Sequence, residues 1–231
     1  MTTITAQIQD VRARIATACA LAGRDVAEVT LLAVSKTFPP EAVREAVAAG
    51  QRAFGENYLQ EAVDKIAALR DLPDLEWHCI GPIQSNKTRL VAEHFDWAHT
   101  VDRLKTAERL SAQRPEALAP LNVCIQVNID GGPTKSGVAP AELPALARAV
   151  AALPRLRLRG LMTIPDLAID LEATSAIHAR TRTLFDQLNV EGLGLDTLSM
   201  GMSADLEPAI AAGSTLVRIG TAIFGERPVK T

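Results

Sequence analysis

Apolar and polar residues alternate along the chain with two different periods. The first segment has apolar residues at three- and four-residue steps, the spacing of an amphipathic helix, and Gly23 marks its end. After this helix, short apolar runs rich in β-branched residues alternate with charged, alanine-rich stretches. The apolar residues of the first segment are Ile4, Ile8, Val11, Ile15 and Cys19.

The apolar runs predict eight strands, and the stretches between them predict helices. Such alternation implies a parallel sheet with right-handed crossovers, and eight repeats favour a closed barrel over an open, doubly wound sheet. The strands are expected at residues 29–34, 52–54, 76–80, 97–100, 122–128, 158–162, 197–200 and 215–219. The helices after the first seven strands are expected to end near residues 49, 69, 94, 112, 152, 188 and 212.

The fold class that follows is α/β, with a single (β/α)8 barrel of the TIM type. Such a barrel commonly needs about 250 residues and at least about 200, and this chain has 231. No GxGxxG turn follows the first strand, which argues against a dinucleotide-binding fold. Because no linker or low-complexity stretch interrupts the pattern, we expect one domain over residues 1–231. The N-terminal helix is expected to close the barrel floor.

Composition and charge narrow the partners and the compartment. The net charge is −3, so no basic excess points to nucleic acid or to an anionic membrane. No apolar run approaches the roughly 20 residues of a membrane span, and charged residues interrupt the N-terminus where a signal peptide would be apolar. The three cysteines and four histidines lack the spacing of metal ligands. We therefore expect a cytoplasmic protein without a metal, whose cysteines are small buried hydrophobic residues.

The active site of a (β/α)8 barrel lies at the carboxyl ends of its strands, so the residues there carry the candidate chemistry. Lys36 follows the apolar run LLAVS at the end of the first strand. An ammonium group in such a place is partly desolvated, which favours the neutral, nucleophilic amine. The alternative is a solvated lysine that begins a loop.

The eighth strand supplies a second candidate group. Arg218 stands inside an otherwise apolar run, and a buried charge needs a partner, which is either a structural ion pair or a ligand. Gly220 and Thr221 follow at once, and glycine lets the backbone come close to a ligand. Strands seven and eight form the recurrent phosphate site of this fold, and residues 199–203 add hydroxyl and N–H groups there. We also expect a helix to begin near Ser203 and to direct its N-terminus at an anion.

A nucleophilic lysine opposite a phosphate site describes a protein that binds a phosphorylated aldehyde. Pyridoxal 5'-phosphate (PLP) is the commonest cofactor of this kind, and a class I aldolase acting on a sugar phosphate would use the same two parts. Arg218 separates the two interpretations. An arginine placed against a pyridine nitrogen keeps that nitrogen unprotonated and weakens the ring as an electron sink.

Long segments of the chain resemble a known family from about residue 31 to residue 225. The segments are LLAVSKTFPPEAVREAVAAG, FGENYLQEAVDK, EWHCIGPIQSNKTRLVAEHFD, PTKSGV, RLRGLMTI and DTLSMGMSADLEPAIAAGSTLVRIGTAIFG. With them the chain resembles the YggS/PROSC family of pyridoxal phosphate homeostasis proteins. The resemblance implies the barrel of the alanine racemase N-terminal domain, without that enzyme's second domain. It also implies that Lys36 carries PLP as a Schiff base and that Arg218 faces the pyridine nitrogen. The other implied cofactor contacts are Ser199, Gly220 and Thr221 at the phosphate and Asn57 and Met200 near the ring.

The role implied by the resemblance is intracellular PLP homeostasis, as a carrier or buffer rather than as an efficient enzyme. Apo forms of PLP-dependent enzymes are the candidate recipients, and we expect a monomer. A PLP-dependent amino-acid racemase is the alternative. Alanine racemases supply a second acid/base, a tyrosine, from the domain that is missing here, and the one tyrosine of this chain, Tyr58, is expected to pack with its hydroxyl at the rim.

One position departs from the family, and a second matches it at a further candidate lysine. Phe38 stands where many relatives have a second lysine, so this chain lacks a neighbouring amine to which PLP could be transferred there. Lys135, in the PTKSG segment, matches a lysine of the relatives and is a candidate for PLP delivery or an ordinary solvated side chain. In the polar segment after the third strand, Ser85 is expected to be the N-cap of the next helix.

Overall fold

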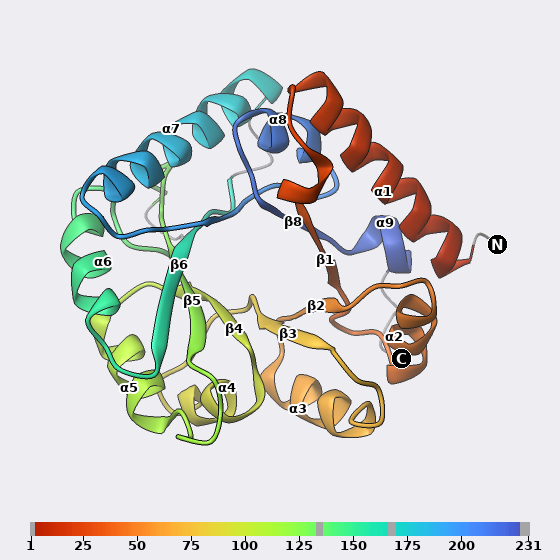
Figure 1. Ribbon diagram of the computed structural model, residues 1–231, viewed down its shortest axis with the longest axis horizontal. Helices are drawn as coiled ribbons and strands as arrows, with labels where there is room; N and C mark the ends of the chain where they lie inside the picture. Colours follow the sequence, from red (N-terminus) through yellow and green to blue (C-terminus); the bar gives the residue numbers. More distant parts are fainter. Residues whose placement is uncertain (1–2, 133–135, 166–169, 227–231) are drawn as a thin grey trace.

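Eight parallel strands form a closed barrel in the computed structural model, which describes residues 3–132, 136–165 and 170–226 (Figure 1). Each strand pairs with the next one along the chain, and the ring closes where β8 pairs in parallel with β1, with Leu32 opposite Arg218. The predicted (β/α)8 barrel is therefore confirmed. The strands are β1 (Thr30–Val34), β2 (Ala53–Glu56), β3 (Glu76–Cys79), β4 (Trp97–Val101), β5 (Leu121–Gln126), β6 (Leu156–Met162), β7 (Thr197–Ser199) and β8 (Leu216–Ile219).

The helices lie outside the strands and enclose the barrel (Figure 1). All eight strands begin and end within two residues of the predicted positions. No helix in the described part of the chain is long and apolar enough to cross a membrane. The helices are α1 (Ile4–Leu21), α2 (Pro40–Ala48), α3 (Leu59–Ala68), α4 (Thr88–His94), α5 (Leu104–Gln113), α6 (Leu143–Ala151), α7 (Leu171–Val190), α8 (Leu206–Ala211) and α9 (Thr221–Phe224), with a 3-10 turn at Val26–Glu28.

We expected from the sequence that helix α1 would close the barrel floor, and this expectation was wrong. The helix lies in the outer ring and packs against α8, α9 and α2 (Figure 1). Arg14 of α1 forms an ion pair with Glu207 of α8, with 2.8 Å between Nη2 and Oε1. The reason is geometric: β8 is followed by α9, a helix of only four residues, so the outer face beside β8 and β1 needs another cover. The apolar stripe of α1 supplies it.

Two helices begin later than predicted. Helix α4 begins at Thr88, and its N-cap position is Lys87 rather than Ser85. The Ser85 carbonyl oxygen accepts a hydrogen bond from Thr88 Oγ1 at 3.2 Å, so Ser85 contributes a backbone acceptor and not a capping side chain. Helix α8 begins at Leu206 and is only six residues long, so the expected helix N-terminus near Ser203 is absent from this segment.

Side chains inside the barrel fall into apolar and polar groups. Alternate residues of each strand point inward. A polar group lies among the inward-facing residues, although aliphatic residues dominate most barrels of this kind. The polar residues are Glu76, His78, His99, Ser199 and Arg218, and the two buried apolar clusters are Leu32, Val34, Ala53, Ile80 and Leu216, and Trp97, Cys124 and Met162.

Candidate functional site

The turn after β1 holds Lys36 at the barrel mouth. Ser35 is buried, and Lys36 and Thr37 are half-buried. Thr37 has a φ of 69°, in the left-handed region that a β-branched residue rarely adopts, at a cost on the order of 1–3 kcal/mol. Its N–H donates to Glu61 Oε1 at 2.6 Å. The strained turn is thus held in place from α3.

A buried ion cluster lies beneath this turn. The Lys65 side chain is 2% exposed, and its Nζ donates to Ser35 O at 2.8 Å, Glu56 Oε1 at 2.5 Å and Glu61 Oε1 at 3.3 Å. The Ser35 hydroxyl donates to the same Glu56 oxygen at 2.7 Å. Burial raises the pKa of Glu56, while Lys65 and Ser35 act against this rise. The cluster therefore fixes the backbone of the residue that precedes Lys36.

The end of β8 lies beside the end of β1. A Cβ on Gly220 would stand 3.4 Å from Val34 Cβ and from Val34 O, so the two strand ends are in contact. The rings of Phe38 and Phe224 stack with their centroids 5.2 Å apart. Gly220 is partly exposed and Thr221 is exposed. The fold therefore brings the segment that carries Lys36 next to Gly220 and Thr221.

Arg218 is buried in the barrel interior and is held by neighbouring strands. Its Nη1 donates to Ser199 O at 2.7 Å and to Ser199 Oγ at 2.8 Å, and its Nη2 donates to Thr163 O at 2.8 Å. Burial lowers the pKa of the guanidinium to about 10, so the group stays charged at neutral pH. These bonds to described residues use three of the five N–H groups of an arginine, which leaves donors for a ligand.

Ser199 and Met200 are neighbours in the chain, but their side chains have different surroundings. Ser199 is fully buried, and its hydroxyl is engaged by Arg218 and by His99 Nδ1, which lies 2.9 Å away. Met200, the next residue along, is also fully buried and belongs to the main core, together with Leu206 of α8. The phosphate contact of Ser199 and the ring contact of Met200 remain predictions, and the structure places neither side chain at the open surface of the mouth.

Unpaired polar atoms gather at the carboxyl ends of the strands. Buried polar groups nearly always have a hydrogen-bond partner, so each exception calls for an explanation. In the described part of the chain, four buried side-chain oxygens at these ends have no partner. They come from three neighbourhoods of the same rim, after β1, β2 and β6. The four atoms are Thr37 Oγ1, Glu56 Oε2, Asn57 Oδ1 and Thr163 Oγ1.

A pair of buried histidines, which we did not expect from the sequence, lies near Arg218. His78 of β3 and His99 of β4 are fully buried, with 2.9 Å between His78 Nδ1 and His99 Nε2. The pKa of His99 is held well below 6.5 and that of His78 is lowered, in both cases mainly by burial. A usable signal was present: Glu76 and His78, and then Trp97 and His99, stand two residues apart in apolar strands, so each pair shares one face.

The buried histidines predict a loss of stability in mild acid. As the pH falls below 6.5, the unfolded chain takes up protons that the folded imidazoles do not. The free energy of unfolding should then fall by up to about 1.4 kcal/mol per pH unit for each histidine. Urea denaturation between about pH 7 and about pH 5.5 measures this slope. His99→Gln should reduce this slope, and a slope equal to that of the wild type would refute the assignment.

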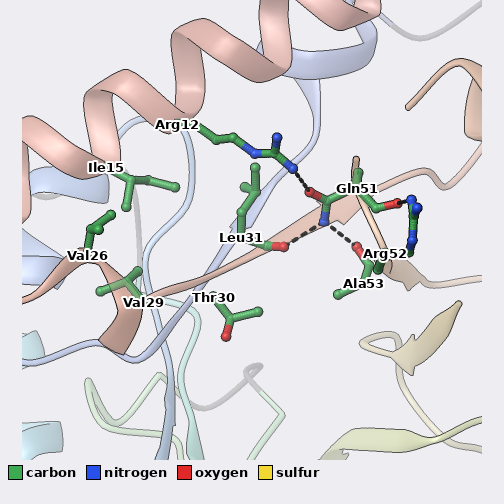
Figure 2. Close-up of a pocket in the computed structure, with 9 residues that line it drawn as sticks. All are labelled: Arg12, Ile15, Val26, Val29, Thr30, Leu31, Gln51, Arg52 and Ala53. Carbon is green, nitrogen blue, oxygen red and sulfur yellow. Dashed lines mark hydrogen bonds between the residues drawn. The ribbon is translucent and has the colours of Figure 1, made fainter. Parts of the chain in front are cut away.

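A cavity at the opposite end of the barrel does not belong to this site. Its volume is about 390 Å³, and it lies between α1 and the amino ends of β1 and β2 (Figure 2). Gln51 lines it, donating from Nε2 to Leu31 O and Ala53 O, and accepting from Arg12 Nη2. Arg52 donates to the Val47 and Gln51 carbonyls. The two arginines that line this cavity therefore already bind backbone carbonyls and Gln51.

The candidate Lys135 lies outside the residues that the structure describes.

Comparison with known proteins gives the family. A family model described as "Alanine racemase, N-terminal domain" matches residues 7–228. A protein of Pseudomonas aeruginosa named "Pyridoxal phosphate homeostasis protein" is 64% identical over 227 residues, which are 98% of this chain and 97% of that protein. A protein of the same name from Escherichia coli K12 is 56% identical over 229 residues, 98% of each chain.

A solved structure gives the same result. It is described as PipY of Synechococcus elongatus PCC7942 with PLP bound, and it superimposes with a TM-score of 0.81 at 44% identity. The match covers 91% of this chain and 100% of that one. With its closed barrel and these full-length matches, the chain belongs to the alanine racemase N-terminal domain family, among the pyridoxal phosphate homeostasis proteins.

Proposed function

We propose that this chain binds PLP at the barrel mouth, with the cofactor held as a Schiff base on Lys36, and that it serves PLP homeostasis as a carrier or buffer. The names of its full-length relatives support the homeostasis role, and the PLP in the PipY structure supports the cofactor. The observation that carries the proposal is the position of Lys36, which follows a fixed residue, Ser35, at the end of β1, where Val34 contacts Gly220 of the neighbouring strand end.

The residues at the mouth fit such a cofactor. PLP needs an amine for its aldehyde, donors for its phosphate and polar neighbours for its ring substituents. Lys36 offers the amine, and Gly220 and Thr221 offer an accessible backbone and a hydroxyl. The unpaired oxygens of Asn57 and Thr163 are buried at the same rim and are available to a polar ligand. A phosphorylated aromatic aldehyde would satisfy groups that the protein alone leaves unsatisfied.

Each of these residues has a distinct task in the proposal. The cluster of Lys65, Glu56 and Ser35 holds the Lys36 turn, so the amine is presented from a rigid support. Arg218 faces the ring nitrogen and, as a group that cannot accept a hydrogen bond, leaves that nitrogen unprotonated. Bound PLP supplies an electrophilic aldehyde and a ring that can withdraw electrons. An arginine at the nitrogen weakens that withdrawal, which suits storage better than turnover.

The alternative, an amino-acid racemase, needs a second acid/base across from the lysine. The one tyrosine of the chain, Tyr58, is 53% exposed at the start of α3. A solvated phenol at the surface is a poor substitute for an acid enclosed in a site. Chiral analysis of amino acids incubated with the loaded protein distinguishes the two functions. Racemisation well above the rate given by free PLP would favour the enzyme.

The absorbance spectrum tests the proposal most directly. After incubation with PLP and removal of the excess, the protein should show a band near about 420 nm that shifts on borohydride reduction. Lys36→Ala should lose the band, and Lys105→Ala, which removes an exposed lysine of α5, should keep it. A colourless wild-type protein would overturn the proposal. A reducible adduct with a keto-sugar phosphate instead would favour an aldolase.

The setting of this function is part of the proposal. The three cysteines are buried and unpaired, which suits a reducing compartment such as the cytoplasm. We propose a monomer that delivers PLP to apo forms of PLP-dependent enzymes. Size-exclusion chromatography with light scattering tests the monomer, and transfer of the absorbing cofactor to a colourless apoenzyme tests the delivery.

A further inference from the structure

A continuous chain of hydrogen bonds runs through the barrel from its floor to Arg218. It begins at Glu76, the first residue of β3, whose side chain is 49% exposed. Glu76 Oε1 lies 2.7 Å from His78 Nε2, and His78 Nδ1 lies 2.9 Å from His99 Nε2. His99 Nδ1 lies 2.9 Å from Ser199 Oγ, which accepts from Arg218 Nη1 at 2.8 Å. Each intermediate group uses both of its polar positions within the chain.

We propose that Glu76, at the barrel floor, orients the Arg218 end of the cofactor site through this chain, with His78 and His99 as positioning residues. The inference rests on the proposed function for its effect on PLP. The chain of hydrogen bonds itself is a property of the protein without PLP.

The two end groups of this hydrogen-bond chain, Glu76 and Arg218, fix the direction of every hydrogen bond in it. Glu76 is ionised, because the hydrogen bond from His78 holds the pKa of its carboxyl below the usual value, and a carboxylate only accepts. His78 must therefore carry its proton on Nε2. A neutral imidazole has one N–H, so His78 Nδ1 accepts, and His99 must donate from Nε2. His99 Nδ1 then accepts from the Ser199 hydroxyl.

At the other end, Arg218 only donates. Ser199 Oγ accepts from Arg218 and gives its single hydrogen to His99, so all four hydrogen bonds are satisfied with both histidines neutral. The opposite direction would place two hydrogen donors, Arg218 and His99, on the Ser199 oxygen and would leave the hydroxyl hydrogen without an acceptor in the chain. A carboxylate at position 76 excludes that arrangement.

The surroundings keep the chain rigid and give Glu76 access to solvent. The His78 ring stacks on Trp97, with centroids 5.2 Å apart and planes at 8°. Arg159 lies over the Trp97 ring at 4.7 Å and pairs with Asp196 at 2.8 Å. A cavity of about 230 Å³ at the floor is lined by Glu76, His78 and these three residues, together with neighbours that include Glu28. A change at position 76 therefore alters the solvated end of the chain and leaves the packed interior in place.

Substitutions at position 76 separate the effect of the hydrogen-bond direction from the effect of the negative charge of Glu76. Glu76→Gln keeps an acceptor for His78 Nε2 and should preserve the direction. Glu76→Lys offers only a donor, so His78 and His99 are expected to carry their protons on Nδ1, and His99 then competes with Arg218 for the Ser199 oxygen. Glu28→Lys changes the same charge in the same cavity, and Glu28 pairs with Arg24 rather than with a histidine.

The first measurement needs no PLP. Long-range 1H–15N correlation spectra of the PLP-free protein report which nitrogen of each imidazole carries the proton. We expect Nε2–H for His78 and His99 in the wild type, in Glu76→Gln and in Glu28→Lys, and Nδ1–H in Glu76→Lys. An Nδ1–H form of either histidine in the wild type would overturn the chain as we infer it.

The second measurement is the dissociation constant for PLP, followed by the absorbance of the bound cofactor. Glu76→Lys should weaken binding by about three- to tenfold, the effect of one misdirected hydrogen bond, while Glu76→Gln and Glu28→Lys should bind as the wild type does. If Glu76→Lys carried its imidazole protons on Nδ1 and still bound PLP as tightly as the wild type does, the influence of Glu76 on the cofactor site would be refuted. A wild type that fails to bind PLP would instead overturn the proposed function, and the imidazole spectra would still decide the direction of the chain.

Discussion

Replacing Lys65 by methionine is expected to lower the free energy of unfolding by about 3–5 kcal/mol. The substitution removes the cation from a cluster in which the side chains of Lys65 and Glu56 are 2% and 0% exposed. Glu56 then keeps a buried carboxyl with only the Ser35 hydroxyl as a close donor. Urea denaturation with an unchanged slope measures the loss.

A second substitution shows whether the unpaired charge causes that loss. In Glu56→Gln combined with Lys65→Met, both charges of the buried Lys65–Glu56 pair are gone, and part of the stability should return. Burial already raises the pKa of Glu56, and removing Lys65 takes away a group that lowers it. The folded single variant therefore binds a proton more readily than its unfolded chain, and its deficit should grow as the pH rises above about 4.5. If the loss in the free energy of unfolding did not depend on pH, lost packing and not the unpaired carboxylate would be its cause.

Gly160→Ala is expected to destabilise the barrel by at least about 3 kcal/mol, at the upper end of what overpacking usually costs. Gly160 lies in β6 opposite Thr197 of β7, and a Cβ there would stand only 1.6 Å from Thr197 O. A carbonyl oxygen within a paired strand cannot move aside, so the β6–β7 pairing must open. The midpoint of thermal or urea denaturation measures the effect.

Gly192→Ala is the matched control for this glycine. Gly192 has a φ of 88° and no atom within 4 Å of an added Cβ. Alanine should cost about 1 kcal/mol there, from backbone conformation alone. If the two variants lost equal stability, the clash at Thr197 would not be the cause of the Gly160 effect.

Most of the fold follows from local patterns in the sequence. The apolar runs placed every strand within two residues, because strands buried on both faces form continuous β-branched segments. The position of α1 could not be predicted in the same way. The stripe that includes Ile8 and Ile15 shows that one helix face is buried, but not which surface covers it. That depended on α9 being too short to cover the outer face beside β8.

Candidate site residues could be named from the sequence where a charged residue stands within an apolar strand or just after one. Arg218 and Lys36 stood out in this way, and the structure places both at or near the carboxyl ends of their strands. The support around them could not be predicted, because it depends on contacts between distant elements. Lys65 reads as an ordinary helical lysine until α3 packs it under Ser35. His78 and His99 lack metal-ligand spacing, and only the barrel places their rings together.

The pairing of β8 with β1 has a consequence for synthesis on the ribosome. Lys36 precedes Arg218, Gly220 and Thr221 in the sequence by most of the barrel, so it is translated well before them. A nascent chain that has released β1 through β7 still lacks the wall beside Val34. Under the proposed function, such a chain cannot retain PLP, so loading follows the release of β8. Translation products that stop before β8 would therefore not deplete the cell's supply of the cofactor.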